Sequence, residues 1–223
     1  MKSFKTIAAS MCAVLVMVGC NNMQKGAAIG AGGGALLGAI VGKIAGNTAV
    51  GAAVGGAVGA GAGAIIGKKM DKAKAEAEAV KNAQVESVTD ANGLQAVKVT
   101  FDSGILFTTG SSTLSSTAKT SLSQFSNVLK NNADCDVAVQ GYTDNAGWKN
   151  STAAQSQQKN LELSQQRAQA VTNYLLSLGV SNNQIRSTMG YGEDNPVADN
   201  STAAGKAQNR RVEVYMDASQ AMI

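Results

Sequence analysis

The second half of the chain alternates short apolar runs with segments of helical spacing. Strict alternation of apolar and polar residues predicts a strand over 96–101. Further strands are predicted at 137–140, 185–190 and 212–216, and a short apolar run lies at 105–107. Apolar residues at helical spacing predict helices over 115–131 and 161–178. The order of these elements indicates an α+β fold, an αβ sandwich with helices on one face of a mixed sheet.

A second pattern, made of glycine, occupies residues 26–69. Glycines recur every four residues at 26, 30, 34, 38, 42 and 46, and again at 51, 55, 59, 63 and 67. On a helix this period places the glycines on one face, where another helix can approach closely. Two such helices joined at Asn47-Thr48 would form a glycine-zipper helical hairpin.

Two interpretations of this glycine-rich segment stay open. Lys43 interrupts the first run, and Ala and Gly are only weakly apolar. The segment is either a hairpin that associates with a membrane or forms homo-oligomers, or a glycine-rich tether. Residues 70–94 are interpreted as a linker, with a charged, Ala-rich helix over 71–84.

The first 19 residues are typical of an export signal. Lys2 and Lys5 precede the apolar run 7–18, which is short for a membrane span. The segment ends in Met17-Val18-Gly19-Cys20, which resembles a lipobox. We therefore expect a signal peptide over 1–19, acylation of Cys20 and a lipidated N-terminus over 20–25. The alternative is an ordinary secretory signal with an incidental cysteine.

Composition and charge divide the chain in the same way. Residues 1–81 carry nine lysines and three acids (9 − 3 = +6), and residues 82–223 carry ten basic and twelve acidic residues (10 − 12 = −2). The basic excess lies near the apolar segment rather than on the folded part, which favours a membrane surface and argues against nucleic acid. The chain has no histidine, so it lacks the usual zinc sites and Ser-His or Cys-His nucleophile pairs. We expect no metal and no cofactor, and a buried, inert thiol at Cys135.

Six motifs follow one another in the second half of the chain. They are Phe107-x-x-Gly110-Ser111-x-x-Leu114, Gly141-Tyr142-Thr143-Asp144, Asn160-x-x-Leu163-Ser164-x-x-Arg167-Ala168, Gly190-Tyr191-Gly192-Glu193, Pro196-Val197-Ala198-x-Asn200 and Asn209-Arg210-Arg211-Val212-Glu213. In this order they resemble the OmpA-like peptidoglycan-binding domain shared with Pal and MotB. With the lipobox and the zipper, the chain resembles YiaD-like lipoproteins of the OmpA family.

The resemblance implies a domain and a location. The domain is a β-α-β-α-β-β OmpA-like domain over 95–217, followed by a tail over 218–223. The implied location is the outer membrane, because Asn21 rather than Asp follows the acylated cysteine, with the domain in the periplasm.

The resemblance also implies a ligand, the diaminopimelate of a peptidoglycan stem peptide. This zwitterion needs a fixed carboxylate for its ammonium group and a guanidinium for its carboxylate. The resemblance gives these roles to Asp144 and Arg167. It adds further residues around them: Asn160, Leu163, Thr143, Gly110 and Arg210.

Structural roles for the same residues stay open at this point. Asp144 could stabilise a turn, and Arg167 could pair with Glu162 or with Asp144. Of Arg210 and Arg211, we expect one at the site and the other in a structural ion pair.

The sequence departs from the family pattern in two places. Tyr142 stands where the family usually has histidine. The polar segment 148–159 lengthens the spacing between Asp144 and Arg167, either as a lid with Trp148 as its anchor or as a surface insertion.

Three functions are compared. The first is non-covalent binding of peptidoglycan that tethers the outer membrane to the wall, with no enzymatic activity. The second is an enzyme acting on peptidoglycan, which is disfavoured because no histidine or paired-carboxylate motif is present. The third is an oligomeric glycine-zipper scaffold or pore that the wall domain only positions.

Overall fold

The computed structural model describes residues 60–90 and 94–219. The signal peptide, Cys20, most of the glycine zipper and the last residues of the tail lie outside these described residues. Among the described residues, no helix has both the length and the apolar character needed to cross a membrane.

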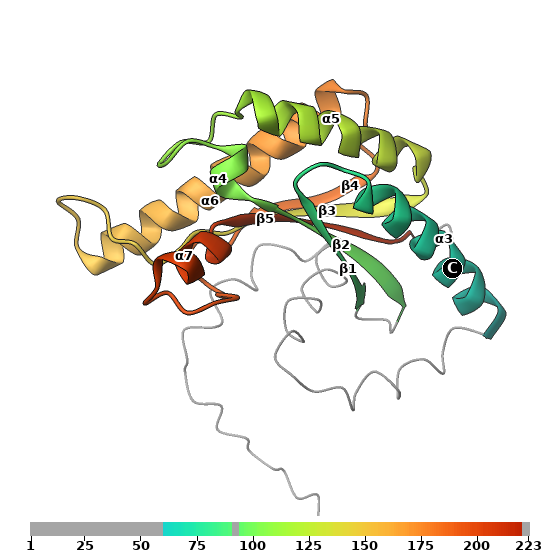
Figure 1. Cartoon of the computed structure of the whole chain (residues 1–223), viewed down its shortest axis with the longest axis horizontal. Coiled ribbons are helices and arrows are strands. Elements are labelled where there is room, and N and C mark those ends of the chain that lie inside the picture. Colours follow the sequence, from blue (N-terminus) through green and yellow to red (C-terminus); the bar gives the residue numbers. More distant parts are fainter. Residues whose placement is uncertain (1–59, 91–93, 220–223) are drawn as a thin grey trace, which may run out of the picture. The chain divides into compact units, whose positions relative to one another are not determined.

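A five-stranded mixed sheet forms the centre of the described region (Figure 1). Its strands are β1 (Ala83–Thr89), β2 (Gln95–Asp102), β3 (Cys135–Gly141), β4 (Ile185–Gly190) and β5 (Arg211–Ala218). They lie in the order β1-β2-β5-β3-β4, and only the β3–β4 pair is parallel. The strand nearest the C-terminus is therefore central and connects both halves of the sheet.

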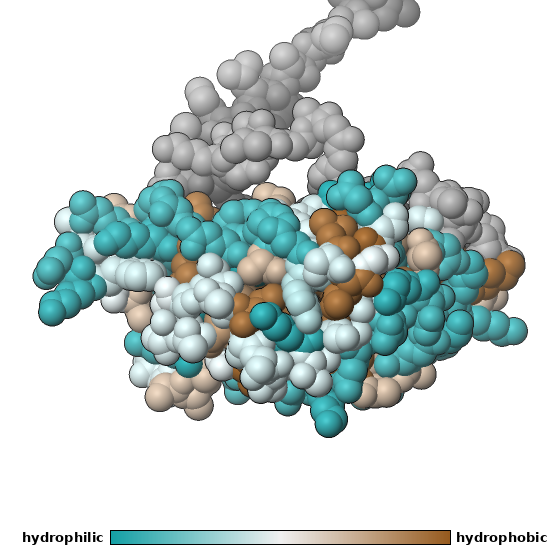
Figure 2. Space-filling view, turned by 90° about the horizontal axis from the view of Figure 1, so that it is seen from above, coloured by the Kyte–Doolittle hydropathy of each residue, from teal (hydrophilic) through white to brown (hydrophobic). Residues whose placement is uncertain are grey.

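The helices and the sheet enclose one main core. The helices are α3 (Ala60–Glu78), α4 (Ser103–Leu106), α5 (Ser116–Asn131), α6 (Ala153–Ser177) and α7 (Ala203–Asn209). Alternate residues of β2 and β5, such as Val99 and Val214, meet Phe125 of α5 and Val171 of α6 in this core. The helix-covered side, seen from above in Figure 2, is mainly hydrophilic, with apolar residues in small groups. The α+β class predicted from the pattern is confirmed.

The structure extends the domain toward the N-terminus, beyond the expected boundary at residue 95. The segment 70–94, expected as a linker, contains the second half of α3 and the whole of β1, which pairs antiparallel with β2. Met70, Ala73 and Ala77 of α3 are buried in the main core, because their spacing places them on one helix face. An ion pair between Lys69 and Asp134 joins α3 to the start of β3. This segment is therefore packed structure rather than a free connection.

Three other elements differ from the predicted pattern. The apolar run at 105–107 overlaps the end of a helical turn, α4, rather than forming a strand. A helix, α7, separates the last two strands. Helix α6 begins at Ala153 instead of 161, because a capping box of Thr152 and Gln155 satisfies its first backbone amides. Most of the polar segment 148–159, expected as a lid or a surface insertion, thus belongs to the first turns of α6.

Two glycines bring α6 directly onto the sheet. A Cβ on Gly141 would lie 2.2 Å from the backbone oxygen of Ser164, and a Cβ on Gly190 would lie 2.2 Å from the backbone nitrogen of Gln165. Neither clash could be relieved by a side-chain rotation, because both contacted atoms are backbone. Glycine at these two positions fixes the height of α6 above the ends of β3 and β4, and so the place of Arg167.

Two buried acidic groups, the Cys135 thiol and the Asp217 carboxyl, have raised pKa values. Cys135 is buried as expected, and burial, followed by the charge of Asp134, raises the pKa of its thiol to about 12. Asp217 on β5 is 6% exposed, and neither carboxylate oxygen has a hydrogen-bond partner within residues 60–90 and 94–219. Burial, followed by the charges of Asp90 and Asp136, raises the pKa of Asp217 from 3.8 to about 7.

The raised pKa of Asp217 predicts that folding stability falls as the pH rises from about 4 to about 7. Over this window the folded state holds a proton that the unfolded chain releases. Asp217→Asn stays neutral, so we expect it to be about 2 kcal/mol more stable than the wild type at pH 8, with the gap closing toward pH 4. Urea unfolding of the full chain across this pH range measures the gap. Asp194→Asn, at an exposed position, should follow the wild type, and a gap independent of pH would contradict the assignment.

Candidate functional site

The predicted site residues come together at one end of the sheet. Asp144 follows the end of β3, and Arg210 follows the end of α7. Asn160, Leu163 and Arg167 lie on one face of α6, because their spacing of three and four residues matches the helical turn. Chain segments far apart in sequence thus supply one cluster of charges.

Asp144 is buried and forms an ion pair with Arg210. The Oδ2 atom of Asp144 lies 2.6 Å from Nη1 of Arg210, and its Oδ1 accepts a hydrogen bond from the Ala146 amide at 3.0 Å. Asp144 is 7% exposed, whereas the Arg210 side chain is 38% exposed. Asp144 therefore stabilises its own turn and also presents a charge, so the two expected roles are compatible.

Arg167 is buried but only partly used by the protein. It is 3% exposed, and its Nε donates to the backbone oxygen of Ser111 at 3.0 Å. Its guanidinium lies over the ring of Phe107, 5.2 Å from the centroid. Burial and the nearby charge of Arg210 lower the pKa of Arg167, while Asp144 opposes the shift.

The two terminal nitrogens of Arg167 make no hydrogen bond to any residue that the structure describes. Within the same residues Arg167 forms an ion pair with neither Glu162 nor Asp144, so the structural bridges considered from the sequence are not formed. Arg167 thus keeps a two-nitrogen edge that fits a carboxylate.

Asn160 connects the parts of the site. Its Nδ2 donates to the backbone oxygen of Asp144 at 3.4 Å and to Oε2 of Glu193 at 2.9 Å. Its Oδ1 accepts from the indole Nε1 of Trp148 at 2.7 Å. Glu193 adds a second carboxylate that sequence reasoning did not assign, although its motif Gly190-Tyr191-Gly192-Glu193 was noticed. The site therefore contains two negative charges, on Asp144 and Glu193, and two positive charges, on Arg167 and Arg210.

The remaining predicted residues have more limited parts. The Thr143 amide donates to the Gly192 oxygen at 2.7 Å and so is not free for a ligand. The Thr143 hydroxyl is buried and has no hydrogen-bond partner among the described residues. Gly110, with φ of 68°, occupies the third position of a turn closed by the Ser111 amide and the Thr108 oxygen, where glycine is favoured. Leu163 is buried between Asn160 and Arg167 on the helix face.

The two neighbouring arginines divide as the sequence suggested. Arg211 points to the opposite face of the sheet, where its Nε lies 2.7 Å from Oε1 of Glu213. Its guanidinium stacks on Tyr142, 3.8 Å from the ring centroid, and Tyr142 stacks on Tyr191. Burial and the charge of Glu213 raise the pKa of Tyr142, so its ring stays neutral. Tyr142, where the family usually has histidine, therefore serves packing on the side of the sheet away from α6.

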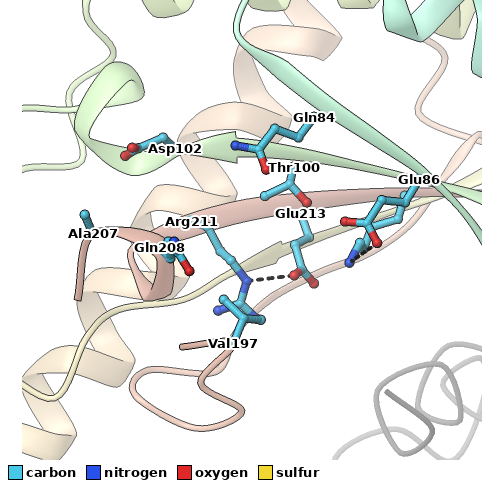
Figure 3. A pocket seen from close by; sticks show the side chains of 10 residues that line it. Gln84, Glu86, Thr100, Asp102, Val197, Ala207, Gln208, Arg211 and Glu213 are labelled. Carbon is cyan, nitrogen blue, oxygen red and sulfur yellow. Dashed lines mark hydrogen bonds and ion pairs between the residues drawn. The ribbon is translucent and has the colours of Figure 1, made fainter. Parts of the chain in front are cut away.

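A hollow of about 380 Å³ lies on that opposite face (Figure 3). Its lining includes Thr100, Asp102 and Gln208, together with the Arg211–Glu213 pair that the figure shows with a dashed line. It contains none of the predicted site residues. Its buried charges are already paired, since Lys98 lies 3.2 Å from Glu86 and Arg211 is held by Glu213. We therefore place the candidate site at Asp144 and Arg167 rather than in this hollow.

Comparisons with known proteins identify relatives for both parts of the chain. Residues 106–210 match the model of the OmpA family, and residues 1–71 match that of the YMGG-like Gly-zipper. The chain is 43% identical to the probable lipoprotein YiaD of Escherichia coli over 118 residues, which are 53% of this chain and 47% of YiaD. It is 41% identical to the peptidoglycan-binding protein ArfA of Mycobacterium tuberculosis over 96 residues, 43% of this chain and 27% of ArfA. The matches thus span less than half of these relatives.

Among solved structures, the cell wall anchor of the T6SS from Pseudomonas aeruginosa is similar. The similarity has a TM-score of 0.54 at 27% identity and covers 67% of this chain and 97% of that chain. The shared fold extends over nearly the whole of that structure.

Proposed function

We propose that this chain is an outer-membrane lipoprotein that binds peptidoglycan non-covalently and tethers the membrane to the cell wall, because residues 106–210 match the model of the OmpA family. Anchorage through acylated Cys20 and a periplasmic domain belong to the same proposal. The similarity to YiaD, a probable lipoprotein, and to ArfA, a peptidoglycan-binding protein, supports it. The name of ArfA describes binding rather than catalysis, and we propose no enzymatic activity for this chain.

The observation that carries the proposal is the uncommitted edge of Arg167. Arg167 is 3% exposed, yet its two terminal nitrogens make no hydrogen bond to any residue in the described part of the chain, so they are open to the carboxylate of a ligand. Beside it, Asp144 and Glu193 supply carboxylates for an ammonium group, and Arg210 supplies a second cation. This alternation of charges matches diaminopimelate, which carries an ammonium and a carboxylate on one carbon.

Co-sedimentation of membranes with the wall tests the tether. Vesicles that contain a fluorescent lipid and the acylated full-length chain should pellet with purified Gram-negative sacculi at low speed, and free diaminopimelate in excess should release them. The Cys20→Ala chain should itself bind sacculi but leave the vesicles in the supernatant. Vesicles that stay in suspension with the acylated wild type would contradict the tether, and an unbound Cys20→Ala chain would contradict peptidoglycan binding itself.

A further inference from the structure

Trp148 is held in one orientation at the edge of the candidate site. Its backbone amide donates to Oγ of Ser156 at 3.0 Å, and its indole Nε1 donates to Oδ1 of Asn160 at 2.7 Å. The side chain is neither buried nor fully exposed. Both N–H groups are used inside the protein, so the part of the ring that remains accessible is apolar.

Trp148 lies one amide side chain away from the charge cluster. Asn160, which binds the indole, also reaches the backbone oxygen of Asp144 at 3.4 Å and the carboxylate of Glu193 at 2.9 Å. Both acceptors, Ser156 and Asn160, lie in the first two turns of α6, so the start of this helix holds Trp148 in place. The segment 148–159 thus adds a rigid aromatic wall next to the place proposed for diaminopimelate.

The geometry points to a sugar subsite at Trp148: we propose that its indole stacks against a pyranose ring of the peptidoglycan strand. This inference rests on the proposed grip at Asp144 and Arg167. Diaminopimelate is the third residue of the stem peptide, and the first residue is joined to an N-acetylated sugar. The two intervening residues span about 7 Å when extended, so a sugar lies within reach of a ring placed one side chain from Asp144.

The chemistry of the ring and its neighbour suits this ligand. A pyranose presents a face of C–H bonds and a rim of hydroxyl and amide groups. The indole offers a flat apolar surface to such a face. The Nζ of Lys159 lies over one face of the ring, 5.8 Å from its centroid, and donates to Oγ of Ser151 at 2.9 Å. The sugar would therefore stack on the other face, with Lys159 as a cationic donor nearby. A carboxylate or ammonium group of the peptide would gain nothing from the indole surface itself.

A direct readout exists because Trp148 is the single tryptophan of the 223-residue chain. Titration of the full-length protein with the disaccharide tripeptide should shift the tryptophan emission to shorter wavelength. The same tripeptide without sugar should bind and leave the emission nearly unchanged. By calorimetry, the sugar should improve the affinity of the wild type by roughly three- to tenfold.

Two variants separate stacking from a positioning role. Trp148→Ala should lose the gain from the sugar and keep the affinity for the free tripeptide, which also shows that the fold and the peptide grip are intact. Trp148→Phe keeps an aromatic face but cannot donate to Asn160, and it should retain most of the gain. An equal loss for both ligands, or a Phe variant as weak as the Ala variant, would overturn the sugar subsite in favour of a role through Asn160.

The two proposals fail in different ways. A wild-type protein that binds neither ligand would overturn the grip at Asp144 and Arg167, and the subsite with it. A wild-type protein that binds both ligands equally, without an emission shift, would overturn the subsite alone.

Discussion

Arg167→Lys is expected to weaken binding of the full-length protein to sacculi by about 30-fold or more, because the loss of one partner of a buried charged contact typically costs about 2–5 kcal/mol. Lysine keeps the positive charge but offers a point charge instead of a two-nitrogen edge. It also cannot reproduce the bond from Nε of Arg167 to the Ser111 oxygen. The bound fraction in a sacculus pull-down over a range of protein concentrations measures the loss.

Asp144→Asn should weaken binding to sacculi by a similar factor, because Asp144 is proposed to bind the ammonium group of the ligand. Asparagine has nearly the same shape and its oxygen can still accept from the Ala146 amide, but it gives up the charge that attracts an ammonium group. It also leaves Arg210 without its partner.

A second ion pair provides matched controls for both variants. Arg186 on β4 and Asp136 on β3 form an ion pair at 2.9 Å, and the Arg186 side chain is 51% exposed. Arg186→Lys and Asp136→Asn should therefore bind sacculi like the wild type. Wild-type binding by Arg167→Lys and Asp144→Asn together would remove the site from this end of the sheet, and weakened binding by the controls would show a general effect of charge.

The fold was predicted best where burial depends on strongly apolar residues. The strands β2, β3 and β5 are rich in Val or Phe and, with the less apolar β4, were all anticipated. A helix over 71–84 was also expected, but the packing of α3 and the strand β1 were not, since the buried face of α3 is largely alanine and β1 is a weakly apolar edge strand. Alanine is nearly neutral in hydropathy, so its spacing in a charged helix does not show which face is buried. The segment of α3 and β1 packs against the domain because β1 pairs with the edge strand β2, and the local sequence pattern does not reveal this contact.

The candidate site was predicted as a set of residues but not as a set of contacts. The motifs placed Asp144, Arg167 and Arg210 near one another, yet Asp144 pairs with Arg210, 66 positions away, rather than with Arg167. Periodicity on one helix or strand carries no information on contacts at such a separation. Glu193 and the role of Asn160 as a connector were missed for the same reason.

The opposite face of the sheet holds a buried charge network on which the fold itself depends. In the Arg211–Glu213 pair the two side chains are 5% and 2% exposed. Glu213 also accepts a hydrogen bond from the Tyr215 hydroxyl at 2.7 Å, and the Nη atoms of Arg211 donate to the backbone oxygens of Asn209 and Asn195. These bonds tie β5 to the chain segments on both sides of α7, which in turn position Arg210 at the candidate site.

Glu213→Gln is expected to lower the free energy of unfolding by about 3–5 kcal/mol, because it leaves the buried charge of Arg211 without a counter-ion. Glutamine preserves the size of the side chain and an oxygen for Tyr215, so the loss reports the charge rather than a cavity. The expected fall in melting temperature is roughly 6–20 °C for a folded unit of about 160 residues. Thermal unfolding of the full-length chain followed by circular dichroism measures it.

A double replacement distinguishes the cost of an unpaired charge from the value of the pair. Removing both charges with apolar side chains of similar volume, as in Arg211→Met with Glu213→Leu, should recover much of the lost stability. Glu78→Gln, which breaks the contact between Glu78 and Lys74, whose side chains are 55% and 34% exposed, should change the stability by less than about 1 kcal/mol. If Glu213→Gln were as mild as Glu78→Gln, solvent would have to reach Arg211, and β5 would not be the fixed frame that holds Arg210 next to Asp144.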